Sequence, residues 1–151
     1  MESHIFRKIF VLFSYTAVIV SSLSSVGKFT MPALSLLGVI IFIISMTVAS
    51  KIHSMFPKGK HNKPDDFEKL LTDGPYSYCR HPFYLSLIIN QLSISLVLMS
   101  WLGSIVCLLL FPGWYALIKL EEKELIEYWG NRYLEYMDNV PTILPFIKRR
   151  R

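Results

Sequence analysis

The densest group of residues that could carry chemistry lies between Gly74 and Tyr84, in the sequence Gly-Pro-Tyr-Ser-Tyr-Cys-Arg-His-Pro-Phe-Tyr. The Gly-Pro pair predicts a turn, and Pro82 suits the first position of a helix. Arg80 and His81 would then stand at a helix N-terminus, where backbone amides and the helix dipole attract a carboxylate or phosphate. The competing interpretation is that Arg80 and the tyrosines are ordinary anchors at a membrane surface.

A second candidate group is the acidic pair Glu121 and Glu122. Acidic residues on a helix usually form a solvated face. Residues 81–118 must turn back on themselves, however, so Glu121 is expected close to His81. A carboxylate there could pair with Arg80 or accept hydrogen bonds from the hydroxyl or ammonium groups of a ligand.

Several other kinds of site are not supported. The chain has no Gly-x-Gly-x-x-Gly, its histidines His53, His61 and His81 lack ligand-like spacing, and no Ser/His/Asp triad stands out. The net charge of +5 comes from residues that flank apolar segments and do not interleave with aromatic residues. We therefore expect neither a metal site nor nucleic-acid binding.

The elements that position these residues are apolar helices. Hydrophobic residues make up 52% of the chain and its mean hydropathy is +0.41. Residues 9–27, 29–50 and 81–118 contain no Asp, Glu, Lys or Arg over 19, 22 and 38 residues. A membrane span needs roughly 20 residues, so the first two stretches each span once and the third spans twice. A cleaved signal peptide is the alternative for the first stretch.

The predicted fold is a single all-α integral membrane domain with about four transmembrane helices. Residues 1–52 form an N-terminal helical hairpin that serves as scaffold, with helices near 8–27 and 31–51. Residues 53–82 form a cytoplasmic connector, with one helical turn near 65–71. Residues 83–120 form a second hairpin, which turns at 100–103 and is kinked or broken at Pro112-Gly113. Residues 121–151 form a cytoplasmic helix, ending near Asn139, and a tail.

Basic residues predict the orientation. With four spans, one side of the membrane carries the cations Arg7, Lys8, Lys51, Lys58, Lys60, Lys63, Lys69 and Lys148 to Arg151. The opposite side has only Lys28. By the positive-inside rule, both termini and the connector face the cytoplasm. A prokaryotic inner membrane is favoured, with the endoplasmic reticulum as the alternative, and the sequence does not determine the oligomeric state. A disulfide between Cys79 and Cys107 is not expected.

The candidate segments, taken in order, resemble the isoprenylcysteine carboxyl methyltransferase family, which is related to the phospholipid methyltransferases. The resemblance extends from near Glu68 to Lys148 and includes Gln91. Its most specific parts are Arg80-His81-Pro82-x-Tyr84, Tyr133-Leu134-Glu135-Tyr136, Val140-Pro141-Thr142 and Leu144-Pro145-Phe146-Ile147.

The resemblance implies that S-adenosylmethionine is the cofactor, held in a cytoplasmic pocket made by the connector, the second hairpin and the C-terminal segment. The cofactor-binding positions are Glu68, Lys69, Leu70, Leu71, Tyr76, His81, Pro82, Phe83, Tyr84, Glu121 and Glu122. The candidate catalytic residues are Arg80, which would orient the acceptor or complete the pocket, and Glu121, which would hold the cofactor. Two positions depart from the family pattern: Glu68 replaces a histidine, and Leu117 replaces an arginine associated with the substrate.

The expected reaction is methyl transfer to a lipid-like or prenylated acceptor that enters from the bilayer, with carboxyl O-methylation of isoprenylcysteine type favoured. A carboxylate acceptor is already ionised at neutral pH and needs no general base. Three alternatives stay open: a phospholipid N-methyltransferase, which would need a base such as Glu121 or Glu122, an NADPH-dependent membrane reductase, and a non-enzymatic membrane protein.

Overall fold

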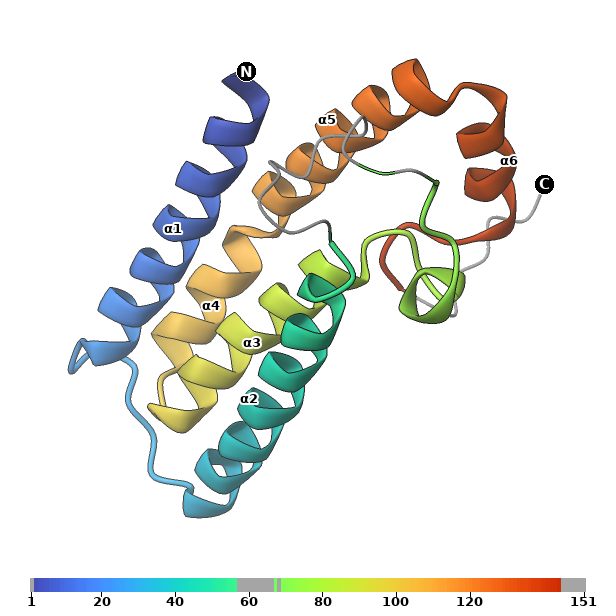
Figure 1. Cartoon of the computed structure of the whole chain (residues 1–151). Coiled ribbons are helices and arrows are strands. Elements are labelled where there is room, and N and C mark those ends of the chain that lie inside the picture. The colour runs from blue at the N-terminus through green and yellow to red at the C-terminus, as the bar shows by residue number, and fades with distance from the viewer. Residues whose placement is uncertain (1, 57–66, 68, 145–151) are drawn as a thin grey trace.

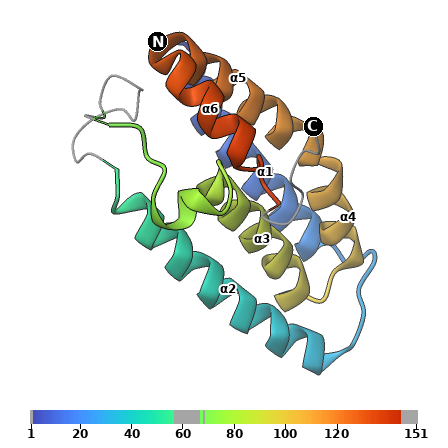
Figure 2. The same cartoon turned by 90° about the vertical axis from the view of Figure 1, so that its right-hand side faces the viewer.

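The computed structural model describes residues 2–56, 67 and 69–144, and these fold into helices joined by short turns (Figure 1). The elements are α1 (Glu2–Leu23), α2 (Pro32–His53), the 3₁₀ helix η2 (Gly74–Ser77), α3 (Pro82–Val97), α4 (Trp101–Leu109), α5 (Phe111–Trp129) and α6 (Asn131–Asn139). Helices α1 to α4 lie roughly parallel as a bundle, and α5 continues beyond it to α6, beside η2 (Figures 1 and 2). The prediction of an all-α chain is thus confirmed for the described residues.

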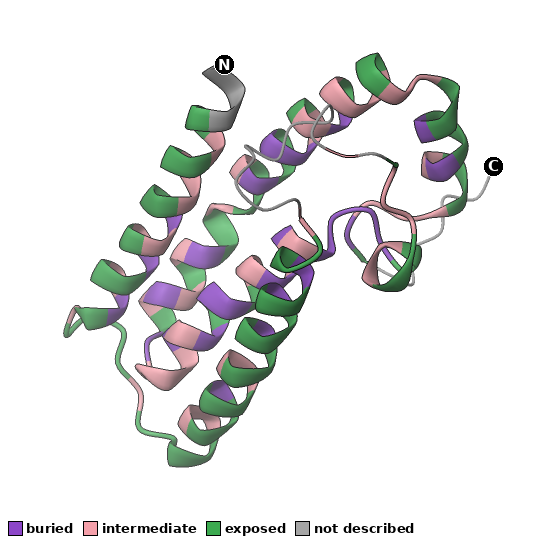
Figure 3. Cartoon of the chain, viewed as in Figure 1, coloured by how far each residue is buried: buried purple, intermediate pink, exposed green. Residues whose placement is uncertain are grey.

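The bundle interior contains many polar side chains besides its apolar ones, and its outer surface is apolar, unlike that of a water-soluble protein. The outward faces of α1 and α2 are exposed, whereas buried residues concentrate on α3 and on the faces that meet it (Figure 3). Asn90 of α3 donates a hydrogen bond to Ser45 of α2 at 3.0 Å, and Gln91 donates one to Ser14 of α1 at 2.6 Å. In a bilayer, such side-chain hydrogen bonds and close packing hold helices together.

Helices α2 and α3 approach each other closely at Gly38. A Cβ atom added there would lie 2.8 Å from the backbone nitrogen of Val97 and 2.9 Å from Cβ of Leu96. Backbone atoms cannot move aside as a flexible side chain can, so only glycine fits this crossing. Small residues at such contacts are typical of membrane helices.

Three helical stretches are long and apolar enough to cross a membrane: Ile5–Leu23, Pro32–His53 and Trp101–Trp129. The third predicted span corresponds to α3, a shorter apolar helix of 16 residues. Pro82 starts α3 at its first turn, and Ser100 caps α4, accepting a hydrogen bond from the Gly103 amide at 3.1 Å. The turn expected at 100–103 therefore lies slightly earlier, at residues 98–100.

Other predicted boundaries need small corrections. Helix α1 ends at Leu23 instead of residue 27, and the turn after it includes Gly27, whose positive φ of 72° a helix does not allow. The returning helix does break near Pro112, at Leu110. A second break, at Gly130 with φ of 55°, was not predicted and separates α6 from α5. Of the turn expected at 65–71, Phe67 and 69–71 are not helical, and the rest lies outside the described residues.

Candidate functional site

Glu122 is the centre of a buried charged cluster at the start of α3. Its Oε1 accepts hydrogen bonds from Nε and Nη2 of Arg80 at 2.9 and 2.6 Å, and its Oε2 accepts one from Lys119 at 2.6 Å. Nε2 of His81 lies 3.4 Å from the same Oε1. Glu122 is only 2% exposed, so this carboxylate joins α5 to the start of α3. Arg80 therefore pairs with Glu122, and not with Glu121.

Arg80 also holds the C-terminal segment. Its Nη1 donates to the carbonyls of Met137 and Val140, and its Nη2 donates to the Thr142 hydroxyl at 2.8 Å. The backbone amide of Arg80 donates to the carbonyl of Pro141 at 2.9 Å. All three guanidinium nitrogens are thus engaged with protein groups. Arg80 therefore connects the start of α3 to α5 and to the segment after α6.

Glu121 lies on a different side of α5 from Glu122 and lines a cavity. Its Oε2 accepts a hydrogen bond from the Tyr84 hydroxyl and lies 3.4 Å from Nη1 of Arg7. Arg7 also donates a hydrogen bond to Glu124 at 3.2 Å. The two adjacent glutamates therefore have separate surroundings: Glu122 lies beneath the site and Glu121 in its wall.

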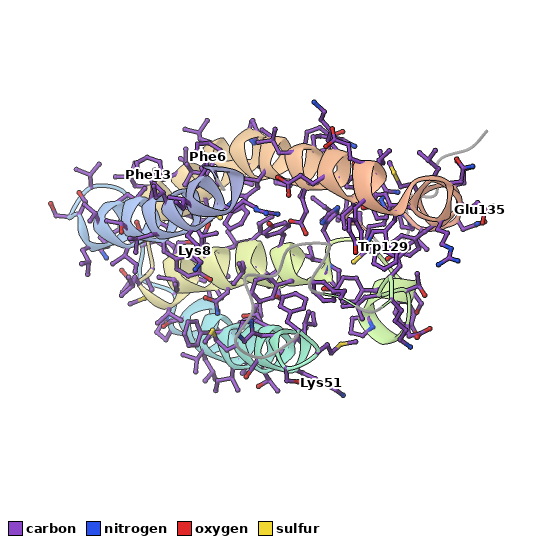
Figure 4. The ribbon with its side chains drawn as sticks, turned by 45° about the horizontal axis from the view of Figure 1, so that its top comes forward. Phe6, Lys8, Phe13, Lys51, Trp129 and Glu135 are labelled. Carbon is purple, nitrogen blue, oxygen red and sulfur yellow. The ribbon has the colours of Figure 1, made fainter. Side chains whose placement is uncertain are left out.

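The cavity has a volume of about 520 Å³ and opens among α1, the end of α2, the start of α3, α5 and α6. This falls within the usual size of a small-molecule site, roughly 300–1,000 Å³. In Figure 4, α1 and α5 form one row of helices, and α2, α3 and η2 form a second row. Lys8 and Trp129 lie toward the space between these two rows. Phe6, Lys51 and Glu135 lie on the outside (Figure 4).

Most of the predicted site residues do meet at this cavity. Those that line it are Lys69, Leu70, Leu71, Tyr76, Arg80, Phe83, Tyr84 and Glu121. His81, Pro82 and Glu122 do not line it and are buried behind its wall. His81 is 4% exposed, so the expectation that it meets the ligand directly does not match its position. Glu68 lies outside the described residues.

Helix α1 supplies wall residues that the sequence analysis assigned to scaffold alone. They are Arg7, Lys8, Val11, Leu12 and Tyr15. The sequence indicated only that Arg7 and Lys8 mark the cytoplasmic side of the membrane. Nothing in the local sequence distinguishes a cation that sets the orientation from a cation that lines a site. Helix α2 contributes His53 and Phe56 near its end. Helices α5 and α6 contribute Glu124, Leu125, Trp129, Tyr133 and Tyr136. The amphipathic pattern of this segment could have indicated the aromatic residues among them.

Three largely buried tyrosines line the cavity. Burial raises the pKa of Tyr76, Tyr133 and Tyr136 above the usual value of a phenol, so all three keep their protons at neutral pH. The Tyr136 hydroxyl donates to the carbonyl of Tyr76 at 2.6 Å. The Tyr133 hydroxyl is buried but has no hydrogen-bond partner among the described residues. A buried donor without a partner is costly, so this hydroxyl fits a site that a polar ligand completes.

The family described as phospholipid methyltransferase matches residues 28–132, which include α2 to α5 and most of the site. The chain belongs to the phospholipid methyltransferase family. With three helices long and apolar enough to cross a bilayer, this family member is an integral membrane protein. The predicted resemblance to isoprenylcysteine carboxyl methyltransferases is confirmed by the relatives of the chain.

Two curated relatives of this phospholipid methyltransferase family member are named protein-S-isoprenylcysteine O-methyltransferase. The Mus musculus protein is 33% identical over 88 residues, 58% of this chain and 31% of the relative. The Schizosaccharomyces pombe protein is 27% identical over 143 residues, 94% of this chain and 59% of the relative. The chain thus spans less than two thirds of the length of either protein.

A solved structure shows the same fold. It is the eukaryotic intramembrane Ras methyltransferase, isoprenylcysteine carboxyl methyltransferase, which superposes with a TM-score of 0.62 at 21% identity. The match covers 93% of the phospholipid methyltransferase family member described here and 52% of the solved chain. Helix α1 therefore belongs to the shared fold, although it lies outside the 28–132 match to the family.

Proposed function

We propose that this protein is an S-adenosylmethionine-dependent methyltransferase that methylates the carboxylate of a prenylated or similarly lipid-like acceptor. The observation that carries the proposal is the cavity at the charged end of the bundle, with Glu121 in its apolar and aromatic wall and a buried, unpartnered hydroxyl on the wall residue Tyr133. The names of the curated relatives support the reaction.

The residues of the cavity fit this cofactor. Tyr76, Leu70 and Leu71 line an apolar part suited to an adenine ring, and Glu121 can accept hydrogen bonds from ribose hydroxyls. The aromatic residues Trp129 and Tyr133 suit a sulfonium cation, because cations are attracted to aromatic faces. His81 and Glu122 would act from behind the wall by holding Arg80 and α3 in place.

When bound, S-adenosylmethionine supplies a methyl group on a sulfonium: the acceptor oxygen forms the new C–O bond while the C–S bond breaks and its electron pair stays on sulfur. The products are a methyl ester and S-adenosylhomocysteine. The protein has no proton to remove from a carboxylate acceptor, so its residues contribute by positioning both reactants and by excluding water.

The proposed topology has four spans within one membrane domain. Helix α3 is 16 residues long, about 24 Å at the usual rise per residue, and is enclosed by the other helices. Arg7 and Lys8 line the cavity, Lys51 is two residues before His53 of the same wall, and Lys28 donates to the carbonyl of Leu98 at the far end of α3. The positive-inside rule therefore favours a cytoplasmic cavity and α6, and we propose the same side for both termini. A prokaryotic inner membrane stays favoured over the endoplasmic reticulum.

The phospholipid N-methyltransferase alternative needs a base, because an amine acceptor must lose a proton. Both candidates for that base are occupied. Glu122 is buried beneath Arg80 and Lys119, and Glu121 is bound to Tyr84 and paired with Arg7. The site therefore favours a carboxylate acceptor.

The first experiment is calorimetric titration of the detergent-purified protein with S-adenosylmethionine, S-adenosylhomocysteine and NADPH. We expect micromolar binding of both adenosyl ligands. Glu121→Gln should weaken that binding about tenfold or more, since the carboxylate loses its charge-assisted hydrogen bonds to the ligand. Glu127→Gln is the matched control, because Glu127 is exposed and lies outside the cavity wall.

Other outcomes of this titration point elsewhere. Binding of NADPH alone would assign the protein to the reductases, and binding of none of the three ligands would make the non-enzymatic interpretation the leading one. Transfer of a labelled methyl group to S-farnesylcysteine then tests the acceptor. A carboxylate acceptor predicts a rate that stays level between neutral and mildly alkaline pH, whereas an amine acceptor predicts a rate that rises.

The variant Tyr133→Phe tests whether the Tyr133 hydroxyl binds the ligand or stabilises the fold. Removing an unpartnered hydroxyl should leave the thermal midpoint of the free protein unchanged or raised, while the affinity for S-adenosylhomocysteine falls about threefold to tenfold, the value of one hydrogen bond. Tyr136→Phe is the contrast: it loses the bond to the Tyr76 carbonyl and should lower the midpoint. Equal effects of the two changes on stability would show that Tyr133 is not a ligand contact.

A further inference from the structure

Two arginines line the cavity, and they differ in the hydrogen bonds that remain available. Every guanidinium nitrogen of Arg80 donates to Glu122, to a backbone carbonyl or to Thr142. Arg7 donates a hydrogen bond from Nη2 to Glu124 at 3.2 Å, and its Nη1 lies 3.4 Å from Glu121. A guanidinium carries five N–H donors, so the donors of Arg7 that these two glutamates do not use remain available to a ligand.

Arg7 lies where the polar and apolar parts of the cavity meet. Its Nη1 is 3.4 Å from Glu121, and its side chain is 13% exposed. One to two turns further along α1, the side chains of Val11, Leu12 and Tyr15 line the same cavity, with Leu87 of α3. These residues belong to helices long or apolar enough to lie in the bilayer. A molecule with an apolar chain along Val11 and Leu12 would thus present its polar head to Arg7.

We propose that Arg7 binds the carboxylate of the methyl acceptor and selects it against neutral and cationic head groups. This inference rests on the proposed function, since it names the residue that recognises the acceptor of that reaction. A guanidinium matches a carboxylate with two parallel N–H to O bonds, which fixes the direction of the acceptor oxygens as well as binding them.

The charges around Arg7 leave room for an anion. Glu121 and Glu124 carry two negative charges, and the bound cofactor brings a net positive charge with its sulfonium. Arg7, Lys8 and Lys69 line the same cavity, so with the cofactor bound the cations outnumber these two carboxylates, and an acceptor carboxylate reduces the imbalance. A protonated phospholipid amine would instead add a cation beside Arg7, which is repulsive in a partly buried site.

The test compares two ligands that differ only in the head group: S-farnesylcysteine and its carboxamide. Each is titrated calorimetrically into the purified protein, with and without saturating S-adenosylhomocysteine. We expect the wild-type protein to prefer the carboxylate by about tenfold or more, the value of a charge-assisted bidentate contact. Arg7→Gln should abolish this preference, and Arg7→Lys should retain part of it because the charge remains.

Arg132→Gln is the matched control, because Arg132 is an exposed arginine on α6 outside the cavity wall and its removal should leave the preference unchanged. A preference that persists in Arg7→Gln, or that the wild-type protein lacks, would overturn the role of Arg7. The titration of the wild-type protein with S-adenosylhomocysteine reports separately on the proposed function, because it involves no change at Arg7. Absence of that binding would contradict the cofactor assignment, whereas binding without a preference for the carboxylate would contradict only the role of Arg7.

Discussion

Glu122→Ala is expected to destabilise the protein by about 3–5 kcal/mol, the usual result of removing one partner from a buried ion pair. Glu122 is 2% exposed and accepts hydrogen bonds from both Arg80 and Lys119. Without it, the Arg80 guanidinium, itself 8% exposed, is left buried with an unbalanced charge. Thermal unfolding in detergent measures the effect.

A matched surface change and a double variant make this prediction specific. Glu127→Gln removes an exposed pair, with 3.9 Å between Glu127 and Lys123, and should change the stability by less than about 1 kcal/mol. The double variant Arg80→Met with Glu122→Leu removes both buried charges, so it should be more stable than Glu122→Ala alone. A single variant as stable as the wild-type protein would mean that the cluster is not buried in solution.

Trp114→Ala is expected to cost about 3–5 kcal/mol, because it leaves a large cavity in the packed core. Trp114 is fully buried, and its ring packs edge-to-face on Phe10 of α1 at 5.4 Å and against Tyr84 of α3 at 5.8 Å. The residue therefore holds α5 against the two helices that carry Arg7 and Tyr84. Because Glu121 lies two turns further along α5, we also expect weaker binding of the adenosyl ligand.

Trp114→Phe is the control for ring packing. The Trp114 indole nitrogen is buried without a hydrogen-bond partner among the described residues, so phenylalanine loses no hydrogen bond and should cost less than about 1.5 kcal/mol. The two variants are compared by thermal unfolding and by titration with S-adenosylhomocysteine. If the phenylalanine variant were as unstable as the alanine variant, this position would require the indole ring itself, and a smaller aromatic ring would not be sufficient.

The sequence predicted the helices and much of the cavity because both depend on local signals. Uncharged stretches of the length of a bilayer predicted the spans, and Pro82 marked the start of α3. The resemblance contributed Leu70, Leu71, Tyr76 and Tyr84, all of which line the cavity. Helix ends were less accurate: α1 ended at Leu23 instead of residue 27, and Gly130 divided the last helix, since a lone glycine is only weakly informative about its φ.

The assignment of roles to adjacent charged residues depended on the tertiary structure. Glu121 and Glu122 are equivalent in the sequence, but a helix turns by about 100° per residue, so one faces Tyr84 in the cavity and the other Arg80 behind it. Arg7 is more than a hundred positions away from both.

Composition and periodicity were sufficient to determine a membrane-embedded helical protein with a charged site at one end, because bilayer solvation acts on every residue of a span. Which charges pair, which face the cavity and which remain available to a ligand was decided only by the packing of α1, α3 and α5. These contacts join residues distant in the chain, and no local pattern encodes them.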